Sequence, residues 1–276
     1  MSNGQIPQVT GGTIPAADVA GILRQTGMTI EQLLLGLVPQ AQKYALPPIS
    51  NFFVGAVALG ASGSIYFGAN YEFVGQALSF TVHGEQAATA NAIAHGETGM
   101  QMLAVSAAPC GYCRQFLYEL TTASSLQILL PNTPDTPLTQ LLPDAFGPGD
   151  LGVTAALMSP QSHNLTLSNP DPVAQAALKA ANASYAPYTF SYSGVALKTK
   201  DGGIYAGQVA ENAAFNPSMS PLEQAVVNLV ITGGKSYADI ADAVLVEVAN
   251  AKASQIAATR DVLATITSVP LRIFQV

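Results

Sequence analysis

The chain contains few cysteines and few charged residues. Only two of its 276 residues are cysteine, and charged residues make up 10%. Two cysteines cannot form the disulfide framework of a small secreted domain, and this pattern favours a reducing compartment. Hydrophobic residues make up 49%, so there is ample material for buried cores but little charge to solvate a large monomer surface, which favours an oligomer.

Basic residues are scarce as well. Ten Lys and Arg stand against 17 Asp and Glu, the formal net charge is −7, and no Lys/Arg-rich run occurs. Proteins that grip a phosphate backbone use clustered cations to release counterions, so this composition argues against nucleic acid as a partner. No run of 18 apolar residues and no leader-like segment occurs, so we expect a soluble cytoplasmic protein without a membrane partner.

Both cysteines lie in one short motif, Pro109-Cys110-Gly111-Tyr112-Cys113, which begins 24 residues after the glutamate of His83-x-Glu85. A structural zinc usually takes four protein ligands, whereas His83, Cys110 and Cys113 leave a fourth position for water. Glu85 is then an uncoordinated carboxylate placed to handle the proton of that water. The motif predicts one catalytic zinc ion per chain.

The spacing of the two cysteines suits this role. Three positions apart at the start of a helix, Cys110 and Cys113 share one face, and the amides and dipole of the helix N-terminus help thiols to ionise. Arg114 follows directly, and we expect it to offset the thiolate charge, although a solvated helix residue is the alternative. A C-x-x-C pair by itself is equally typical of a dithiol redox protein, and the upstream His83-x-Glu85 favours zinc.

The sequence repeats itself. A shift of 139 residues aligns several landmarks without gaps: Pro48 with Pro187, Gly55 with Gly194, Ile65-Tyr66 with Ile204-Tyr205, Gly68 with Gly207, and Glu72 with Glu211. A one-residue deletion then places Glu85-Gln86 opposite Glu223-Gln224 and Pro221 opposite His83. Residues 248–252, near the positions of the two cysteines, contain no thiol. We therefore expect a second copy that binds no metal and is catalytically inactive.

The element order predicts a layered α/β fold. Apolar spacing indicates helices in 16–25 and 29–45, with a capping box at Thr29 and Gln32, and then a β-β-α-β-α-β order in each copy, whose later strands run parallel. Five prolines in 131–150 indicate a linker or extended arm. We therefore divide the chain into an N-terminal helical segment (1–45), a catalytic domain with its arm (46–150) and a degenerate domain (151–276).

The chain resembles a known enzyme family over nearly its whole length. H-x-E…P-C-x-x-C is the signature of the zinc deaminases. Further similar stretches are Ser50-Asn51-Phe52, Gly68-Ala69-Asn70-Tyr71-Glu72-Phe73, Asp144-Ala145-Phe146-Gly147-Pro148 and Glu211-Asn212-Ala213-Ala214-Phe215-Asn216-Pro217. Together they resemble the two-domain, homodimeric cytidine deaminases of bacterial and plant type, which implies duplicated three-layer α/β/α domains.

The resemblance also implies roles for residues outside the zinc motif. Asn70 and Glu72 match the pair that holds the ribose hydroxyls, and Phe52 matches the aromatic residue that packs on the pyrimidine. The family builds each site across a dimer interface, so we expect Phe146 and the Ala214-Phe215 loop to reach the partner's pocket.

The implied activity is hydrolytic deamination of cytidine and 2′-deoxycytidine in pyrimidine salvage. Three alternatives stay open from the sequence: a deaminase of nucleotides or polynucleotides, a dithiol redox protein, and a non-catalytic protein stabilised by zinc.

Overall fold

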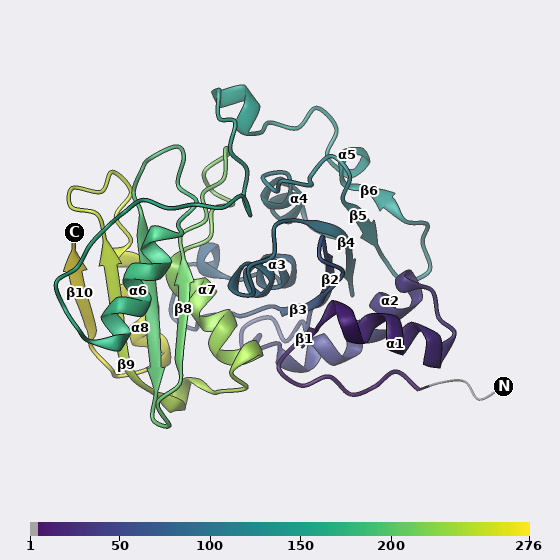
Figure 1. Ribbon diagram of the computed structural model, residues 1–276, viewed down its shortest axis with the longest axis horizontal. Coiled ribbons are helices and arrows are strands. Elements are labelled where there is room, and N and C mark those ends of the chain that lie inside the picture. Colours follow the sequence, from purple (N-terminus) through teal and green to yellow (C-terminus); the bar gives the residue numbers. More distant parts are fainter. Residues whose placement is uncertain (1–4) are drawn as a thin grey trace.

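The computed structural model describes residues 5–276 and consists of two sandwiches, each a β-sheet between helices (Figure 1). The first contains β1 (Thr13–Ile14), α1 (Ala16–Thr26), α2 (Ile30–Ala41), β2 (Gly55–Gly60), β3 (Ile65–Ala69), α3 (Gly84–Ala94), β4 (Met100–Val105), α4 (Gly111–Leu117), β5 (Gln127–Leu129), β6 (Thr136–Pro137) and α5 (Leu138–Leu141). The second contains α6 (Pro172–Asn182), β7 (Ser193–Thr199), β8 (Ile204–Gln208), α7 (Pro221–Val227), β9 (Ile240–Glu247), α8 (Ile256–Ile266) and β10 (Leu271–Gln275).

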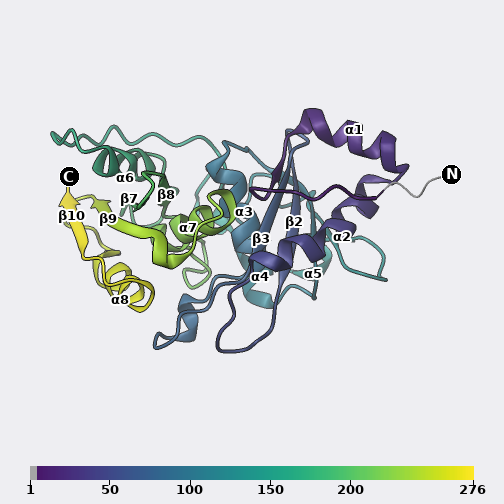
Figure 2. The same ribbon diagram turned by 90° about the horizontal axis from the view of Figure 1, so that it is seen from below.

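The strand orders are β1-β3-β2-β4-β5-β6 and β10-β9-β7-β8. In both sheets the hairpin is antiparallel, whereas the strands joined by a helical crossover, β4 with β5 and β9 with β10, are parallel. This confirms the α/β class and the expected parallel strands. Figure 2 shows the sandwiches side by side, with α1 at one end and α8 and β10 at the other.

Glycines allow helices to approach both faces of the first sheet closely. A Cβ at Gly55 would lie 2.6 Å from the Val38 carbonyl oxygen of α2, and a Cβ at Gly68 would lie 2.2 Å from the Gly84 carbonyl oxygen of α3. The strand register places Gly55 and Gly68 on opposite faces of the sheet. Helices α2 and α3 therefore cover opposite faces, which makes the predicted three layers.

The duplication is confirmed in the strands. Gly55 pairs with Ala69, and Gly194 pairs with Gln208, so the hairpin register recurs 139 residues later. The second sheet also repeats both close approaches, with Gly194 against α6 and Gly207 against α7.

The helix after the hairpin corrects part of the predicted alignment. His83 is the N-cap of α3 and Ser220 is the N-cap of α7, and Gly207 contacts the carbonyl of Pro221 as Gly68 contacts that of Gly84. The helices are therefore related by 137 residues and not by 138. The expectation that Pro221 occupies the place of His83 is wrong by one residue, because Ser220 does.

The same shift changes the partner of the proposed proton carrier. Leu222, and not Glu223, occupies the place of Glu85, and Glu223 corresponds to Gln86. Identical Glu-Gln pairs favoured the wrong register because loop length cannot be read from identity alone. Within residues 5–276, the group of side chains close enough together to hold a metal ion is His83, Cys110 and Cys113 of the first copy.

The N-terminal segment forms the predicted helices and also a strand. Thr29 and Gln32 form the expected capping box, and α2 continues through Pro39. However, β1 pairs with β3 and extends the first sheet, and α2 is one layer of that sandwich. The predicted boundary at residue 45 therefore separates α2 from the β-sheet on which α2 packs.

The proline-rich arm is partly built into the fold. Residues 136 and 137 pair with β5, and α5 follows with Leu138 fully buried. The rest of the arm runs along the surface above α4 (Figure 1). None of the helices in residues 5–276 has the length and apolar character that crossing a bilayer requires.

Replacing Glu223 with glutamine should stabilise the protein at alkaline pH. Burial raises the pKa of Glu223 from 4.5 to about 7, so the folded state binds this proton more tightly than the unfolded state. Its contribution to stability is fully present below pH 4.5 and is lost as the pH rises to about 7, by at most about 3 kcal/mol. Glutamine, the residue of the first copy, keeps the capping position without this loss.

Thermal unfolding of wild type and Glu223→Gln at pH 5 and pH 8 tests this expectation. The variant should match wild type at about pH 5 and unfold several degrees higher at about pH 8. An equal difference at both pH values would contradict it.

Candidate metal centre and active site

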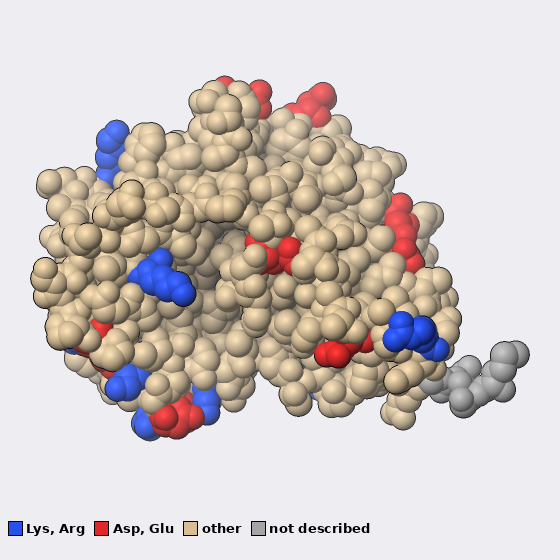
Figure 3. Space-filling view, viewed as in Figure 1, with Lys and Arg blue, Asp and Glu red and all other residues tan. Residues whose placement is uncertain are grey.

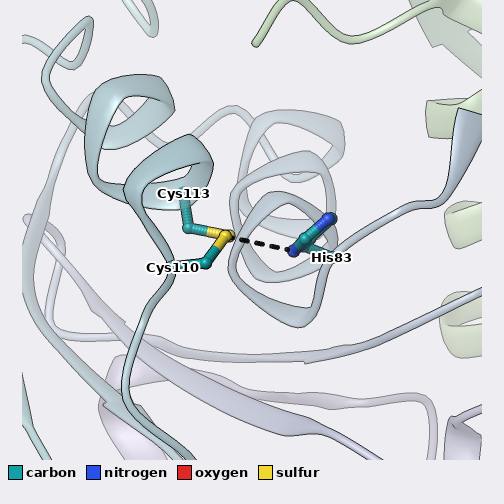
Figure 4. A group of neighbouring side chains, drawn as sticks. All are labelled: His83, Cys110 and Cys113. Atoms are coloured by element: carbon teal, nitrogen blue, oxygen red, sulfur yellow. Dashed lines mark hydrogen bonds between the residues drawn. The ribbon is translucent and has the colours of Figure 1, made fainter. Parts of the chain in front are cut away.

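Two helices begin beside each other and place the three predicted ligands together. His83 is the N-cap of α3 and Cys110 is the N-cap of α4, and Cys113 follows within the first turn of α4. The Cys110 sulfur lies 3.7 Å from His83 Nδ1 and 3.6 Å from the Cys113 sulfur. Figure 4 shows the two cysteine side chains pointing toward the imidazole.

These separations fit a tetrahedral zinc ion. Zinc bonds of about 2.3 Å to sulfur and about 2.0 Å to nitrogen place two sulfurs about 3.8 Å apart and a sulfur and a nitrogen about 3.6 Å apart. The ligand atoms of His83, Cys110 and Cys113 all lie within 4.8 Å of one another. A dithiol redox pair requires no third donor, so the geometry favours zinc over that alternative.

The two thiols differ in environment. Hydrogen bonding from the Cys113 thiol, the amides of the α4 start and the neighbouring His83 lower the pKa of Cys110 to about 5. The same sulfur pairing, together with burial, raises the pKa of Cys113. One ligand is thus exposed and readily ionised, whereas the other is buried and loses its proton only in exchange for a cation.

Glu85 lies in the first turn of α3, with 4% of its surface exposed. Burial raises the pKa of its carboxyl group, although a hydrogen bond from the Cys113 thiol and the charge of His83 act in the opposite direction. The structure therefore brings this acid to the three ligands in an environment that favours holding a proton.

Asn70 and Glu72 lie just after β3 and hold the loop at residues 49–54. The amide of Val54 donates to Asn70 Oδ1 (2.9 Å), and Asn70 Nδ2 donates to the Phe52 carbonyl (2.9 Å). Glu72 accepts hydrogen bonds from the amides of residues 49 and 50 and from the Ser50 hydroxyl. Burial pushes the pKa of Glu72 upward, but the hydrogen bonds from this loop outweigh it and lower the pKa.

The predicted aromatic contacts are exposed in the single chain. Phe52 is 59% exposed, Phe146 is 45% exposed and Phe215 is 61% exposed. Exposed aromatic side chains of this size mark binding or interaction surfaces more often than ordinary surface. Phe215 also has a positive φ of 61°, a backbone conformation that few bulky residues adopt.

Arg114 binds carbonyl groups in the structure. Its Nε donates to the Pro109 carbonyl (2.8 Å), and its Nη1 donates to the Leu141 carbonyl (2.8 Å). Arg114 thereby links the residue that precedes Cys110 to the arm. Its predicted effect on the thiolate charge stays a prediction.

Gln115 was not singled out in the sequence, yet it connects both loops expected near the pocket. Its Nε2 donates to the Phe146 carbonyl (2.7 Å), and its backbone carbonyl accepts from Asn212 Nδ2 (2.9 Å). The helix that carries the cysteines therefore holds the arm and the loop of the second copy. Its position two residues after Cys113 was the available signal.

Two further side chains support His83. Gln86 Oε1 accepts from the His83 amide (3.1 Å), and the Tyr112 ring stacks on the imidazole with centroids 5.2 Å apart. The sequence indicated neither contact, although Tyr112 lies inside the motif and Gln86 directly follows Glu85. Together they limit the orientation of the imidazole.

Comparison with known families matches both halves of the chain. The model described as "Cytidine and deoxycytidylate deaminase zinc-binding region" matches residues 28–127, and a second model with the same description matches residues 138–260. The second match covers a copy without the metal ligands, so the fold persists where the site has been lost.

Curated relatives are similar over most of the chain. A cytidine deaminase from Photobacterium profundum is 47% identical over 251 residues, covering 91% of this chain and 85% of its own length. One from Yersinia pestis is 50% identical over 242 residues, covering 88% and 82%. A solved cytidine deaminase from Mycobacterium tuberculosis is 35% identical and covers 44% of this chain and 99% of its own, with a TM-score of 0.40.

Substitution of a predicted ligand should remove zinc. We expect one zinc per chain in the wild type and more than about tenfold weaker binding in His83→Ala, because two donors hold the ion less well than three. Ser220→Ala, which changes the matching position of the second copy, should leave the zinc content unchanged. Metal analysis after dialysis measures this, and full zinc occupancy in His83→Ala would contradict the ligand assignment.

Proposed function

The chain belongs to the family of zinc-dependent cytidine deaminases, and we propose that it hydrolyses cytidine and 2′-deoxycytidine to uridine and 2′-deoxyuridine with release of ammonia. The observation that carries this proposal is the buried carboxyl group of Glu85 beside three side chains able to hold one metal ion. Zinc, when held by His83, Cys110 and Cys113, supplies a Lewis acid that lowers the pKa of water to about 7 in favourable sites.

Glu85 serves as the proton carrier. It accepts a proton from the attacking water and delivers it to ring N3 as oxygen adds at C4. It then takes the second proton from the new C4 hydroxyl and passes it to the amino group, which departs as ammonia while the C4 carbonyl forms. The net reaction consumes one water and releases one ammonia, so a single carboxyl group acts as base and then as acid. Its raised pKa supports this role, since a carrier works best when it holds and releases the proton with similar ease.

Asn70 is the stronger candidate of the proposed ribose pair. Its amide holds the loop at residues 49–54, and Val209 takes the corresponding place in the second copy, where no ligand set exists. Glu72 and Glu211 make matching hydrogen bonds in the two copies, which supports a loop-holding role in addition to any contact with the sugar. Phe52, within this loop, supplies an exposed ring for the pyrimidine.

A homodimer completes the pocket in this proposal. Within residues 5–276, ten large hydrophobic side chains are exposed: Leu46, Ile49, Phe52, Phe53, Val74, Leu78, Phe146, Leu151, Phe190 and Phe215. Association that covers them would hide apolar surface and bring Phe146, Ala214 and Phe215 to a partner's site. The linkage of both loops to α4 through Gln115 supports this arrangement.

The proposed setting is pyrimidine salvage in the cytoplasm. A site with two thiolate ligands requires reduced cysteines, which a reducing compartment maintains.

Replacing Glu85 with alanine should abolish turnover while zinc stays bound. Removing a general acid–base group costs about 10²–10⁴-fold, and the three ligands are unchanged. Ammonia release from cytidine and zinc content are measured on the same sample. Near wild-type turnover in zinc-replete Glu85→Ala would disprove the proton carrier, whereas absence of turnover in zinc-loaded wild type would favour a non-catalytic zinc protein.

Cytidine should be preferred over cytidine 5′-monophosphate. The chain has few cations, and the one next to the zinc ligands, Arg114, is committed to the carbonyls of Pro109 and Leu141. A phosphate would therefore enter without a partner. We expect at least about tenfold lower kcat/KM for the monophosphate, and equal values would indicate a nucleotide deaminase.

A further inference from the structure

The second sheet has a free edge where the first sheet has an added strand. In the first copy β1 pairs antiparallel with β3, and the Phe67 amide donates to the Gly12 carbonyl (2.8 Å). The counterpart of β3 is β8, and it is the last strand of its sheet. Among residues 5–276 no strand pairs with its outer side, which leaves the amide of Ala206, the counterpart of Phe67, facing outward.

A groove of about 560 Å³ lies beside this edge. Its walls are β8, the end of α3 and one side of α6, and Figure 3 shows a hollow in the middle of the face where these elements meet. In the first copy the equivalent space is filled, because Gly12 packs against Ile231 just after α7. The groove thus corresponds to the place that an extended segment takes in the first copy.

The polar group at the base of the groove supports this comparison. Asn91 Nδ2 donates to the Phe67 carbonyl (3.0 Å) and to the Gly12 carbonyl of the inserted segment (2.9 Å). Asn228 repeats the first bond, to the Ala206 carbonyl (2.8 Å), and has no second one. Its buried Oδ1 has no partner among the described residues. In the first copy the matching Oδ1 accepts from the Thr232 hydroxyl (3.4 Å), whereas the segment accepts from Nδ2. The bond that an occupant of the groove would restore is therefore the second one from Asn228 Nδ2, a buried donor.

The helix above the groove differs in charge between the copies. Gln40 of α2 holds the inserted segment by donating to the Pro7 carbonyl (2.9 Å) and accepting from the Val9 amide (2.9 Å). Gly55 faces Val38 and Gly194 faces Ala177, so α2 and α6 are also related by 139 residues and Lys179 takes the place of Gln40. Lys179 is exposed and makes no ion pair within residues 5–276.

We propose that this groove binds an extended acidic segment of another protein, paired antiparallel with β8 and with a carboxylate facing Lys179. Backbone pairing to a free sheet edge is a common mode of peptide recognition. In the first copy Gln40 contacts Pro7 and Val9, which precede Gly12 by five and three positions. By analogy, the carboxylate lies three to five positions before the residue of the bound segment that faces Ala206. A second copy is not the occupant, because each chain has one such segment and seats it on its own β3.

Labelled peptides test the proposal on the full-length, zinc-loaded protein. The probe is a synthetic peptide with the sequence of residues 5–16, and its acidic version carries Gln8→Glu. We expect saturable binding of one peptide per chain with a Kd below about 1 mM. The acidic peptide should bind about two- to fivefold more tightly, and Lys179→Gln, which restores the residue of the first copy, should remove that gain.

A backbone variant separates groove binding from contacts elsewhere. Ala206→Pro removes the outward amide, and proline is tolerated on edge strands. It should weaken binding of both peptides more than about tenfold while cytidine turnover is unchanged. If this variant fails to fold, hydrogen exchange at the Ala206 amide of wild type replaces it, and the peptide should slow that exchange.

Three results would overturn the proposal. The first is that neither peptide binds saturably, and the second is that wild type binds both peptides with equal affinity. The third is that Ala206→Pro does not weaken binding, or that the peptide does not slow hydrogen exchange at the Ala206 amide. Displacement of β1 from β3 would give the last result, since β8 would not be involved.

Discussion

The zinc site depends on two helices that begin at nearly the same point in space. Helix α3 approaches the sheet at Gly68 of β3, where a side chain would collide with its backbone, and α4 follows β4, which is separated from β3 by β2 alone. This places His83 and Cys110 at adjacent helix ends, with 3.7 Å between the imidazole nitrogen and the sulfur. His83 and Cys110 are helix N-caps, and Cys113 lies in the first turn of α4. Because helix starts and not flexible loops position the ligands, the site is preorganised before the metal binds.

The second copy packs along α3 and also reaches the residues at and just after α4. Glu119, fully buried just after α4, accepts hydrogen bonds from the Tyr185 and Tyr188 hydroxyls and from the Ala213 amide. Gln115 holds the adjoining loop through Asn212. A buried carboxylate satisfied by three donors from another unit fixes their relative position, because separating them would leave the charge unpaired. The second copy is thus part of the support for α4, the helix that carries Cys113.

Comparison of the two copies separates residues that serve the fold from those that serve chemistry. The glycines that admit the helices recur, and so does the glutamate that holds the loop, as Glu72 and Glu211. The positions of His83 and Glu85 became Ser220 and Leu222. Once a site carries no reaction, its ligands are free to change, whereas close backbone contacts still constrain the sheet. At one changed position burial raises the pKa of Glu223, so its ionised form opposes folding at alkaline pH.

The sequence alone determined the duplication and the α/β class and predicted the ligand set and the proton carrier, because these follow from residue chemistry and from spacing within one or two elements. Tertiary structure alone decided the remaining features: the strand formed by residues 13 and 14, the one-residue correction that pairs His83 with Ser220, the role of Gln115, and the free edge of β8. Each of these depends on hydrogen bonds or loop lengths between segments far apart in the chain. Local periodicity carries no record of such contacts, so only the folded chain shows them.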